Sequence, residues 1–295
     1  MLKKPSDWQV LKPMLQISIR DCLLEAQAEL SFLDNPQHSA IILMAHALNR
    51  PKTWIIAHGN ETLGERQKTE FFALTKRLAQ GEPLPYITGK QSFYGLDFKV
   101  SPSVLIPRPE TERLVDEASL WLRANPLASH ALDVGTGSAC IAISLAKNHP
   151  ALTITALDIS EDALNLAKEN AQIHGVQDRI AFQQSDLLAN FTGQADLICA
   201  NLPYIPSATL AELSVSAWEP VNALDGGQDG LAFIRRLLEQ SHAVLKTPGL
   251  ILLEIESSTG EPALDLAKTS YPKANVDLLK DLAGKNRLIR IEVLK

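Results

Sequence analysis

From residue 130 onward the chain alternates between short apolar segments and longer amphipathic ones, and this alternation limits its possible folds more than any other feature. Most of the short segments are separated by stretches with apolar residues at helical spacing, as at 140–148, 161–174, 231–245 and 262–270. Such an order builds a largely parallel sheet with helices on both faces. We therefore expect an α/β domain with a doubly wound, seven-stranded sheet. The expected strands are 131–134, 153–157, 180–184, 196–200, 250–255, 276–279 and 288–293.

The last two expected strands are joined only by residues 281–286. This connection is too short for a helical crossover, so the two strands should pair antiparallel. A doubly wound sheet that ends in an antiparallel hairpin resembles the Rossmann-like fold of class I methyltransferases.

The first eighty or so residues are expected to form a small helical bundle. Apolar residues recur at helical spacing in 19–30 and again in 41–48. Asn35 is typical of the start of a helix and Asn49 of its end. Alternating apolar residues around glycines then suggest a β-hairpin between two domains. The expected parts are a helical domain at 1–82, a hairpin linker at 83–112 and the α/β domain at 113–295.

Charge and cysteine content argue against several classes of protein. The formal net charge is -6, which does not suit binding to a nucleic acid, so no direct nucleic-acid partner is expected. Cys22, Cys140 and Cys199 lack the spacing of metal ligands, as do the seven histidines, so no metal is expected. The N-terminus lacks the apolar stretch of a secretory signal, and no segment is long enough to cross a bilayer. We expect a cytoplasmic protein with no membrane partner.

A glycine-containing segment, Asp-Val-Gly-Thr-Gly-Ser-Ala at 133–139, lies between the first strand of the α/β domain and its first helix. Gly135 and Gly137 let the backbone turn tightly and approach a ligand in front of a helix N-terminus. The segment is either a cofactor-binding loop, anchored by Asp133, or an ordinary strand-to-helix turn. Asp158, at the end of the next strand, favours the cofactor because its carboxylate can accept hydrogen bonds from both hydroxyls of a ribose.

Two acidic residues of this region have alternative roles. Asp158 could instead cap the following helix, but Ser160 is better placed to do so. Asp186 ends the third strand, where it would either meet the adenine of a cofactor or cap its own loop.

Asn201, Leu202, Pro203 and Tyr204 follow the buried segment 196–200, at the sheet edge where parallel sheets bind ligands. They resemble the (N/D)PPY motif of methyltransferases that act on planar, conjugated nitrogens. Such a nitrogen is a poor nucleophile, so an enzyme must aim it and stabilise the positive charge that develops. The Asn201 side-chain oxygen and the Leu202 carbonyl can accept its two N–H groups, and Tyr204 can stack on its plane. The alternative is a bare turn followed by a core tyrosine.

Nearly the whole chain resembles the release factor glutamine methyltransferases, which methylate the glutamine of the Gly-Gly-Gln motif in class I peptide chain release factors. The resemblance is sharpest at 105–112, Leu-Ile-Pro-Arg-Pro-Glu-Thr-Glu, and continues at 218–220, 223–227 and 281–287. It implies methyl transfer from S-adenosylmethionine to the side-chain N5 nitrogen, and it implies that 105–112 forms part of the cofactor pocket's wall. The expected catalytic residues are Asn201, Leu202, Pro203 and Tyr204. The expected cofactor-binding residues are Gly135, Thr136, Gly137, Ser138, Ala139, Asp158, Asp186, Leu187 and Asn201.

The chain departs from the family at Ala139, where a glycine is usual, and at Leu202, where a proline is usual. Alanine suits its position unless the backbone there needs a positive φ. The helical N-terminal domain is the expected contact for the release factor. Asn-Leu-Pro-Tyr also resembles ribosomal RNA adenine dimethyltransferases. Two alternatives therefore stay open: an N6-adenine methyltransferase on RNA or DNA, and a diverged cofactor-binding paralogue with another protein substrate.

Overall fold

The computed structural model describes residues 17–210 and 218–294 and divides the chain into two compact units, Met1–Thr88 and Gly89–Lys295. Residues 1–16, where a secretory signal was considered and not expected, lie outside the described residues. The division falls directly before the hairpin, so the hairpin belongs to the second unit.

The described part of the first unit is helical. Asn35 caps the start of the second helix, where its side chain accepts a 3.1 Å hydrogen bond from the His38 backbone. Asn49 ends the same helix in the left-handed conformation, with a φ of 48°. Both ends lie where the sequence predicts them. Phe71, Leu43 and Met44 are completely buried in the core. The helices are α1 (Ile19–Glu29), α2 (Pro36–Leu48), α3 (Lys52–Ala57), α4 (Glu65–Ala79) and α5 (Leu84–Thr88).

A short antiparallel hairpin opens the second unit, formed by β1 (Lys90–Phe93) and β2 (Leu96–Lys99). Phe93 and Phe98 are buried in the core of the second unit. The Asn170 side chain accepts a 2.8 Å hydrogen bond from the Lys99 backbone and donates one of 2.9 Å to the Ser138 carbonyl. The hairpin is thereby joined to the glycine-containing segment.

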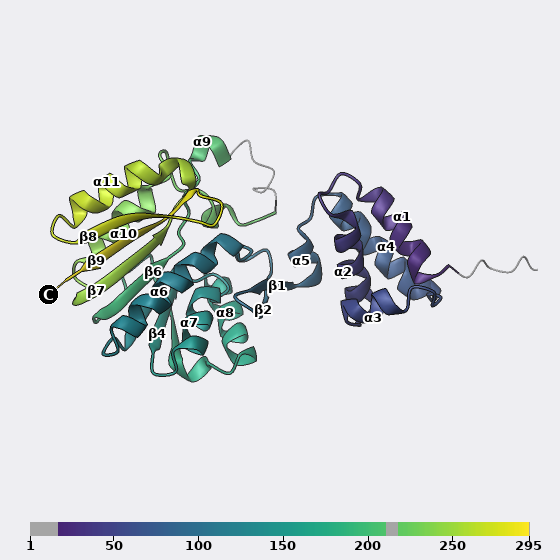
Figure 1. The fold of residues 1–295 in the computed structure, drawn as a ribbon, viewed down its shortest axis with the longest axis horizontal. Helices are drawn as coiled ribbons and strands as arrows, with labels where there is room; N and C mark the ends of the chain where they lie inside the picture. Colours follow the sequence, from purple (N-terminus) through teal and green to yellow (C-terminus); the bar gives the residue numbers. More distant parts are fainter. Residues whose placement is uncertain (1–16, 211–217, 295) are drawn as a thin grey trace, which may run out of the picture. The chain divides into compact units, whose positions relative to one another are not determined.

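The second unit contains a seven-stranded sheet, as the sequence predicts, in the order β5-β4-β3-β6-β7-β9-β8 (Figure 1). The first five strands in this order run parallel, and β9 pairs antiparallel with both β7 and β8. The predicted pairing of the last two strands is therefore confirmed. The strands are β3 (His130–Val134), β4 (Thr153–Asp158), β5 (Ile180–Gln184), β6 (Ala195–Ala200), β7 (Leu245–Glu254), β8 (Asn275–Lys280) and β9 (Asn286–Val293).

Helices cover both faces of this sheet. One face packs against α6 (Glu112–Ala124), α7 (Cys140–Asn148) and α8 (Glu161–Ile173). The other packs against α10 (Ala232–Ser241) and α11 (Gly260–Ser270), and α9 (Ser207–Leu210) follows β6 (Figure 1).

One helix expected from the sequence, at 231–245, is too long at its C-terminal end. The structure ends α10 at Ser241 and begins β7 at Leu245. The Val244 carbonyl accepts a 2.9 Å hydrogen bond from the Ala195 backbone at the start of β6, so the chain has already joined the sheet there. Pairing with the sheet overrides the local helical pattern.

Cys22, Cys140 and Cys199 are free and buried. Among the residues described, no helix has the length and apolar character needed to span a membrane, and no group of three metal-binding side chains is found.

Candidate active site

A cavity of about 490 Å³ is lined by residues at the carboxyl ends of β3, β4, β5 and β6. This is the edge where parallel sheets bind ligands, and the volume is typical of a small-molecule site. Arg108 and Thr111, from the segment expected in its wall, line it as well. Ala139 and Tyr204 do not. The other expected site residues all line the cavity: Gly135, Thr136, Gly137, Ser138, Asp158, Asp186, Leu187, Asn201, Leu202 and Pro203.

The glycine-containing segment after β3 is held against β4. The backbone amides of Gly135 and Thr136 donate hydrogen bonds of 2.8 and 2.9 Å to the Leu157 carbonyl. Gly135 has a φ of 72°, and a Cβ atom there would lie 3.1 Å from Cδ2 of Leu202. A side chain at this position would therefore push against Leu202 and the segment 201–204.

Ala139 ends this segment with a φ of 62°, in the left-handed region that favours glycine. The position thus needs the positive φ that would explain the family's usual glycine. Ala139 is completely buried in the core beneath the sheet edge, and its amide donates a 2.8 Å hydrogen bond to the Thr136 carbonyl. Its methyl group packs in the core rather than in the cavity wall.

Asp158, the last residue of β4, joins the loop to the next helix. Its carboxylate accepts hydrogen bonds of 2.9 Å from the backbone amides of Gly137 and Ser160. Burial is the main reason that its pKa is raised. The side chain of Ser160, not that of Asp158, caps α8 by accepting from Ala163 at 3.2 Å. Asp158 therefore keeps lone pairs for a ligand in the cavity.

Asp133 lies beneath the loop and holds it from below. Its Oδ2 atom accepts hydrogen bonds from the Thr136 hydroxyl at 2.6 Å and the Ala142 amide at 3.1 Å. Burial raises the pKa of Asp133 to about 6. These contacts make it an anchor of the loop.

Asp186 and Leu187 follow β5 and line the cavity. Asn201 follows β6, which is separated from β5 by β4 and β3 in the sheet. The Asp186 carboxylate forms a 2.6 Å ion pair with Arg236, and both side chains are about half exposed. Leu187 is buried and has a φ of 54°. The Asp186 side chain thus contacts α10 through this ion pair.

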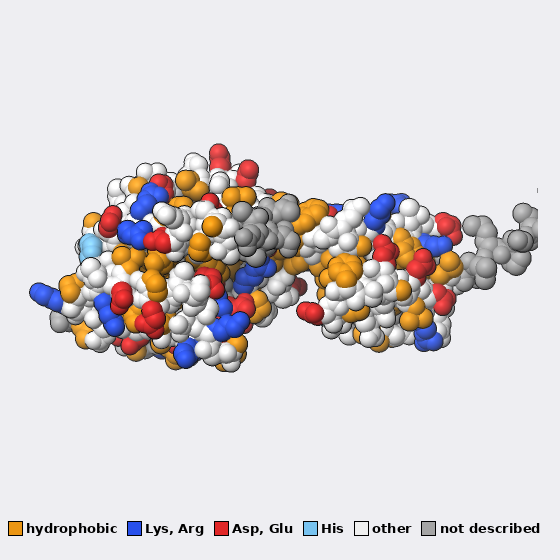
Figure 2. Space-filling model, turned by 90° about the horizontal axis from the view of Figure 1, so that it is seen from above, with side chains coloured by type: hydrophobic (Ala, Val, Ile, Leu, Met, Phe, Trp, Pro, Cys, Tyr) orange, Lys and Arg blue, Asp and Glu red, His pale blue; other side chains and the backbone are white. Residues whose placement is uncertain are grey.

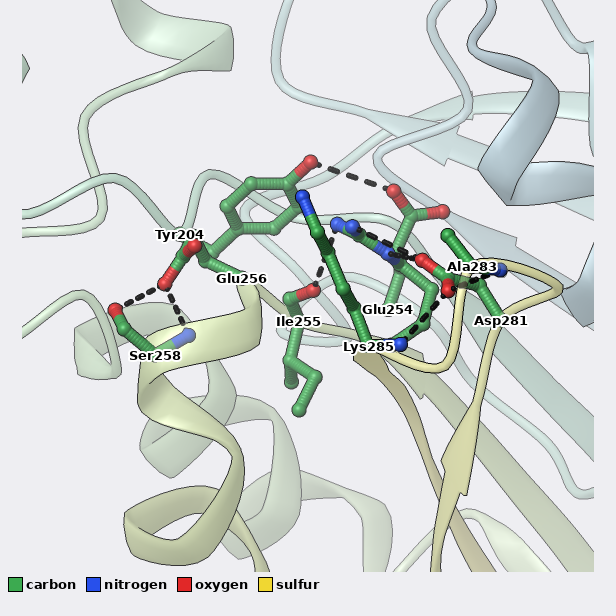
Figure 3. Close-up of polar contacts among 9 residues, drawn as sticks. Tyr204, Glu254, Ile255, Glu256, Ser258, Asp281, Ala283 and Lys285 are labelled. Carbon is green, nitrogen blue, oxygen red and sulfur yellow. Dashed lines mark hydrogen bonds and ion pairs between the residues drawn. The ribbon is translucent and has the colours of Figure 1, made fainter.

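The segment 201–204 follows β6. The Nδ2 atom of Asn201 donates a 3.1 Å hydrogen bond to the hydroxyl of Thr111. The hydroxyl of Tyr204 donates one of 3.3 Å to Oε1 of Glu254, the last residue of β7 (Figure 3). Burial, and next the charge of Glu254, raise the pKa of Tyr204, so it stays a neutral phenol.

Glu254 is a further buried carboxylate of this region, with 2% of its surface exposed. Burial raises its pKa to about 7, and Thr111, Arg287 and Tyr204 partly oppose that rise. Arg287 is held by Asp281 in the turn between β8 and β9, and it also donates to the Ile255 carbonyl at 3.4 Å.

Glu219, which is also a buried carboxylate, holds the cavity wall in place. Glu219 pairs with Arg108 and accepts a 3.3 Å hydrogen bond from the Ile106 backbone. The pair joins the 105–112 segment to the stretch that contains Pro220 and Val221, which also line the cavity. Sequence reasoning assigned no role to Thr111, Glu254 or Glu219 individually. Of these three residues, only Glu254 has a recognisable pattern in the sequence, because it is a carboxylate that directly ends an apolar strand.

Two families of known proteins match parts of the chain. The family described as the PrmC N-terminal domain matches residues 21–89, and the methyltransferase small domain family matches residues 112–216. The release factor glutamine methyltransferase of Moorella thermoacetica is 39% identical over 276 residues, which cover 92% of this chain and 97% of that protein. That of Streptococcus pneumoniae is 40% identical over 242 residues, covering 81% and 85%.

Among solved structures, the hMettl16 catalytic domain in complex with the MAT2A 3'UTR hairpin 6 has a TM-score of 0.52 and 15% sequence identity. The match covers 78% of this chain and 82% of that one. At this identity the likeness concerns the fold alone.

Proposed function

The chain belongs to the release factor glutamine methyltransferases, and on this premise we propose that its substrate is the glutamine of the Gly-Gly-Gln motif in class I peptide chain release factors. The methyl group goes to the side-chain amide nitrogen, N5. The observation that carries the proposal is the position of Asn201, which lines the same cavity as the glycine-containing loop while Thr111 engages its side-chain nitrogen.

S-adenosylmethionine is the proposed cofactor, and the cavity fits it in two respects. Gly135 lies in the cavity wall, and its lack of a side chain leaves room for Leu202, because a Cβ atom there would lie 3.1 Å from Cδ2 of Leu202. The Asp158 carboxylate lies in the wall with acceptor capacity left for ribose hydroxyls. When bound, this cofactor supplies an electrophilic methyl group. The proposed binding residues are those expected from the sequence, and Ala139 supports the loop from the core.

The chain's own residues have to prepare a poor nucleophile. The lone pair of an amide nitrogen is delocalised, and no side-chain base is strong enough to remove its proton. Oδ1 of Asn201 and the backbone carbonyl of Leu202 accept the two N–H groups, and Pro203 stiffens the turn that presents them. Tyr204, which does not line the cavity in this structure, is proposed to stack on the plane of the amide. Holding both N–H groups aims the nitrogen and stabilises the positive charge as it develops.

We also propose a division of work along the chain. The helical part, 1–82, contacts the release factor, the hairpin segment 83–112 connects it, and 113–295 performs the transfer. The match of residues 21–89 to a family of N-terminal domains supports a dedicated first part. Removing it should weaken methylation of the full release factor while leaving cofactor binding intact; an unchanged rate on the full factor would contradict this role.

The alternative acceptor is an adenine N6, because Asn-Leu-Pro-Tyr at 201–204 suits any planar conjugated nitrogen. On the face of the molecule shown in Figure 2, Lys and Arg side chains are interspersed with Asp and Glu. Together with the net charge of -6, this mixture favours a protein substrate over a polyanion.

The proposal is tested by incubating a class I release factor with S-adenosylmethionine and the protein, and then mapping methylation by mass spectrometry. One added methyl group on the Gly-Gly-Gln glutamine is expected with the wild-type protein, and none with Asn201→Ala. An unmodified glutamine with an otherwise folded, cofactor-binding protein would reject the proposed substrate.

A further inference from the structure

The backbone of residues 204–207 lies against a loop at 224–230 that contains three glycines. The Ile205 amide donates a 3.0 Å hydrogen bond to the Leu224 carbonyl, and the Ile205 carbonyl accepts one of 2.8 Å from the Gly226 amide. These two hydrogen bonds form a parallel bridge like that between neighbouring strands of a sheet. The chain is thus tied to this loop directly after the residues proposed to hold the acceptor nitrogen.

Two glycines let the 224–230 loop approach the Tyr204 backbone very closely. A Cβ atom at Gly226 would lie 2.7 Å from Cα of Tyr204, and one at Gly230 would overlap the Tyr204 carbonyl oxygen. Carbon atoms pack at about 3.5–4.0 Å, so a side chain at either position would have to push the loop and Tyr204 apart. Both glycines are buried, so a side chain could not turn into solvent instead.

We propose that Gly226 and Gly230 are positioning residues that hold the segment 201–204 in place beside the cavity. The inference rests on the proposed function, because it concerns how Asn201 and Tyr204 meet an acceptor amide. Neither glycine is among the described residues that line the cavity, so both act through the Tyr204 backbone rather than on the substrate.

Leu202 explains why the segment needs such support, because the family usually has a proline at this position. A proline ring would fix φ of its own residue, whereas a leucine leaves this angle free. Leu202 is 4% exposed and belongs to the same core as Leu231, the residue directly after the loop. The loop and the segment 201–204 are therefore joined through the core as well as through backbone hydrogen bonds. This packing supplies the stiffness that the missing ring would give.

The 224–230 loop is itself held by two aspartates. The Asp225 carboxylate accepts hydrogen bonds of 2.7 Å from the Ser207 hydroxyl and 2.9 Å from the Gly227 amide. The Asp229 carboxylate accepts one of 3.0 Å from the Leu231 amide, directly before α10. The first of these aspartates joins the loop to the chain after Tyr204 once more, this time through side chains.

Alanine substitutions separate the close approach from backbone strain. Gly226→Ala and Gly230→Ala should each lower kcat on the release factor by roughly 10- to 100-fold, as a displaced catalytic segment does, with little change in KM. Gly175→Ala is the matched control. Gly175 has a φ of 65°, similar to 74° at Gly230, but a Cβ atom there would meet nothing within 4 Å. It precedes β5, at the sheet edge opposite the cavity, so this variant should keep the wild-type kcat.

Cofactor affinity distinguishes positioning of the segment from support of the cavity wall. In calorimetry, the Kd of Gly226→Ala for S-adenosylmethionine should stay close to that of the wild type. An unchanged kcat, or a loss of cofactor affinity as large as the loss of kcat, would overturn the inference. If the glycine variants do not fold, Ser207→Ala decides, because it removes one hydrogen bond and adds no atom. It should lower kcat by about 2- to 5-fold at unchanged cofactor affinity, and a wild-type kcat would overturn the inference.

A spectroscopic readout needs no release factor, so it separates this inference from the proposed function. The chain has four tyrosines, and in protein labelled with fluorotyrosine the ¹⁹F signal of Tyr204 is the one lost in Tyr204→Phe. This signal should move in Gly226→Ala and Gly230→Ala and stay in place in Gly175→Ala. An unmoved signal in folded Gly226→Ala would overturn the inference. If the wild type does not methylate the release factor but the signal moves as predicted, the substrate is wrong and the positioning contact stands.

Discussion

Replacing Glu254 by glutamine should change how the stability of the protein depends on pH. Burial raises the pKa of this carboxyl from 4.5 to about 7. The folded protein therefore holds the proton more tightly than the unfolded chain does. The resulting contribution to stability is complete below about pH 4.5 and is lost as the pH rises through about 7. At about 1.4 kcal/mol for each pH unit, the loss amounts to about 3 kcal/mol.

The assay is denaturant unfolding of the wild type and of Glu254→Gln at a series of pH values from about 5 to about 8. The variant cannot ionise at this position, so its stability should fall less over this range, by about 2–3 kcal/mol. Asp133 and Asp158, whose pKa values are also raised, are present in both proteins and cancel in the comparison. The quantity to compare is therefore how steeply the free energy of unfolding changes with pH in the two proteins. The absolute stability of Glu254→Gln is less informative, because it also includes the poorer hydrogen bonding of a buried glutamine amide.

Glu261→Gln provides the control, because it makes the same chemical change at an exposed position on α11. It should keep the wild-type pH dependence. Parallel pH dependences for the wild type and Glu254→Gln would refute the reasoning, since they would mean that Glu254 has no raised pKa in the folded protein.

Three further substitutions test other parts of the site. Gly135→Ala should destabilise the protein or its cofactor complex by about 1 kcal/mol more than Gly137→Ala does. Of the two positions, only Gly135 would bring the new Cβ atom close to another side chain, at 3.1 Å from Leu202. Equal effects of the two substitutions in thermal unfolding would contradict this. Asp158→Asn should weaken S-adenosylmethionine binding by roughly 10-fold or more in calorimetry, the loss of a charged acceptor, and an unchanged affinity would remove Asp158 from the cofactor site. Arg108→Met should lower the free energy of unfolding by about 2 kcal/mol, because it leaves the buried Glu219 carboxylate without its ion-pair partner. Adding Glu219→Gln to this variant should recover part of the loss. No recovery would mean that the broken ion pair is not the cause.

The order of elements could be predicted from the sequence because each strand of the sheet is a short apolar run between amphipathic helices. The positions of β3, β4 and β5 follow from this pattern to within a residue or so. The end of α10 could not be predicted in the same way. Residues 243–245 are apolar and suit either a helix or a strand, and only pairing with β6 decides between them.

The candidate site was predictable where a motif places its residues at the carboxyl end of one strand. Asn201 and the glycine-containing loop are of this kind, and both line the cavity. The contact between Asn201 and Thr111 joins residues ninety positions apart, and that between Tyr204 and Glu254 joins residues fifty apart. No spacing in the sequence indicates such contacts, because they depend on which strands become neighbours.

The central claim is that this chain transfers a methyl group to a release factor glutamine through Asn201. The most direct measurement supplies methyl-labelled S-adenosylmethionine together with a class I release factor and total RNA in one reaction, and follows where the label appears. We predict label in the release factor, abolished when its Gly-Gly-Gln glutamine is replaced and when Asn201→Ala is used. Label in the RNA instead would make the 201–204 motif an adenine site and contradict the account.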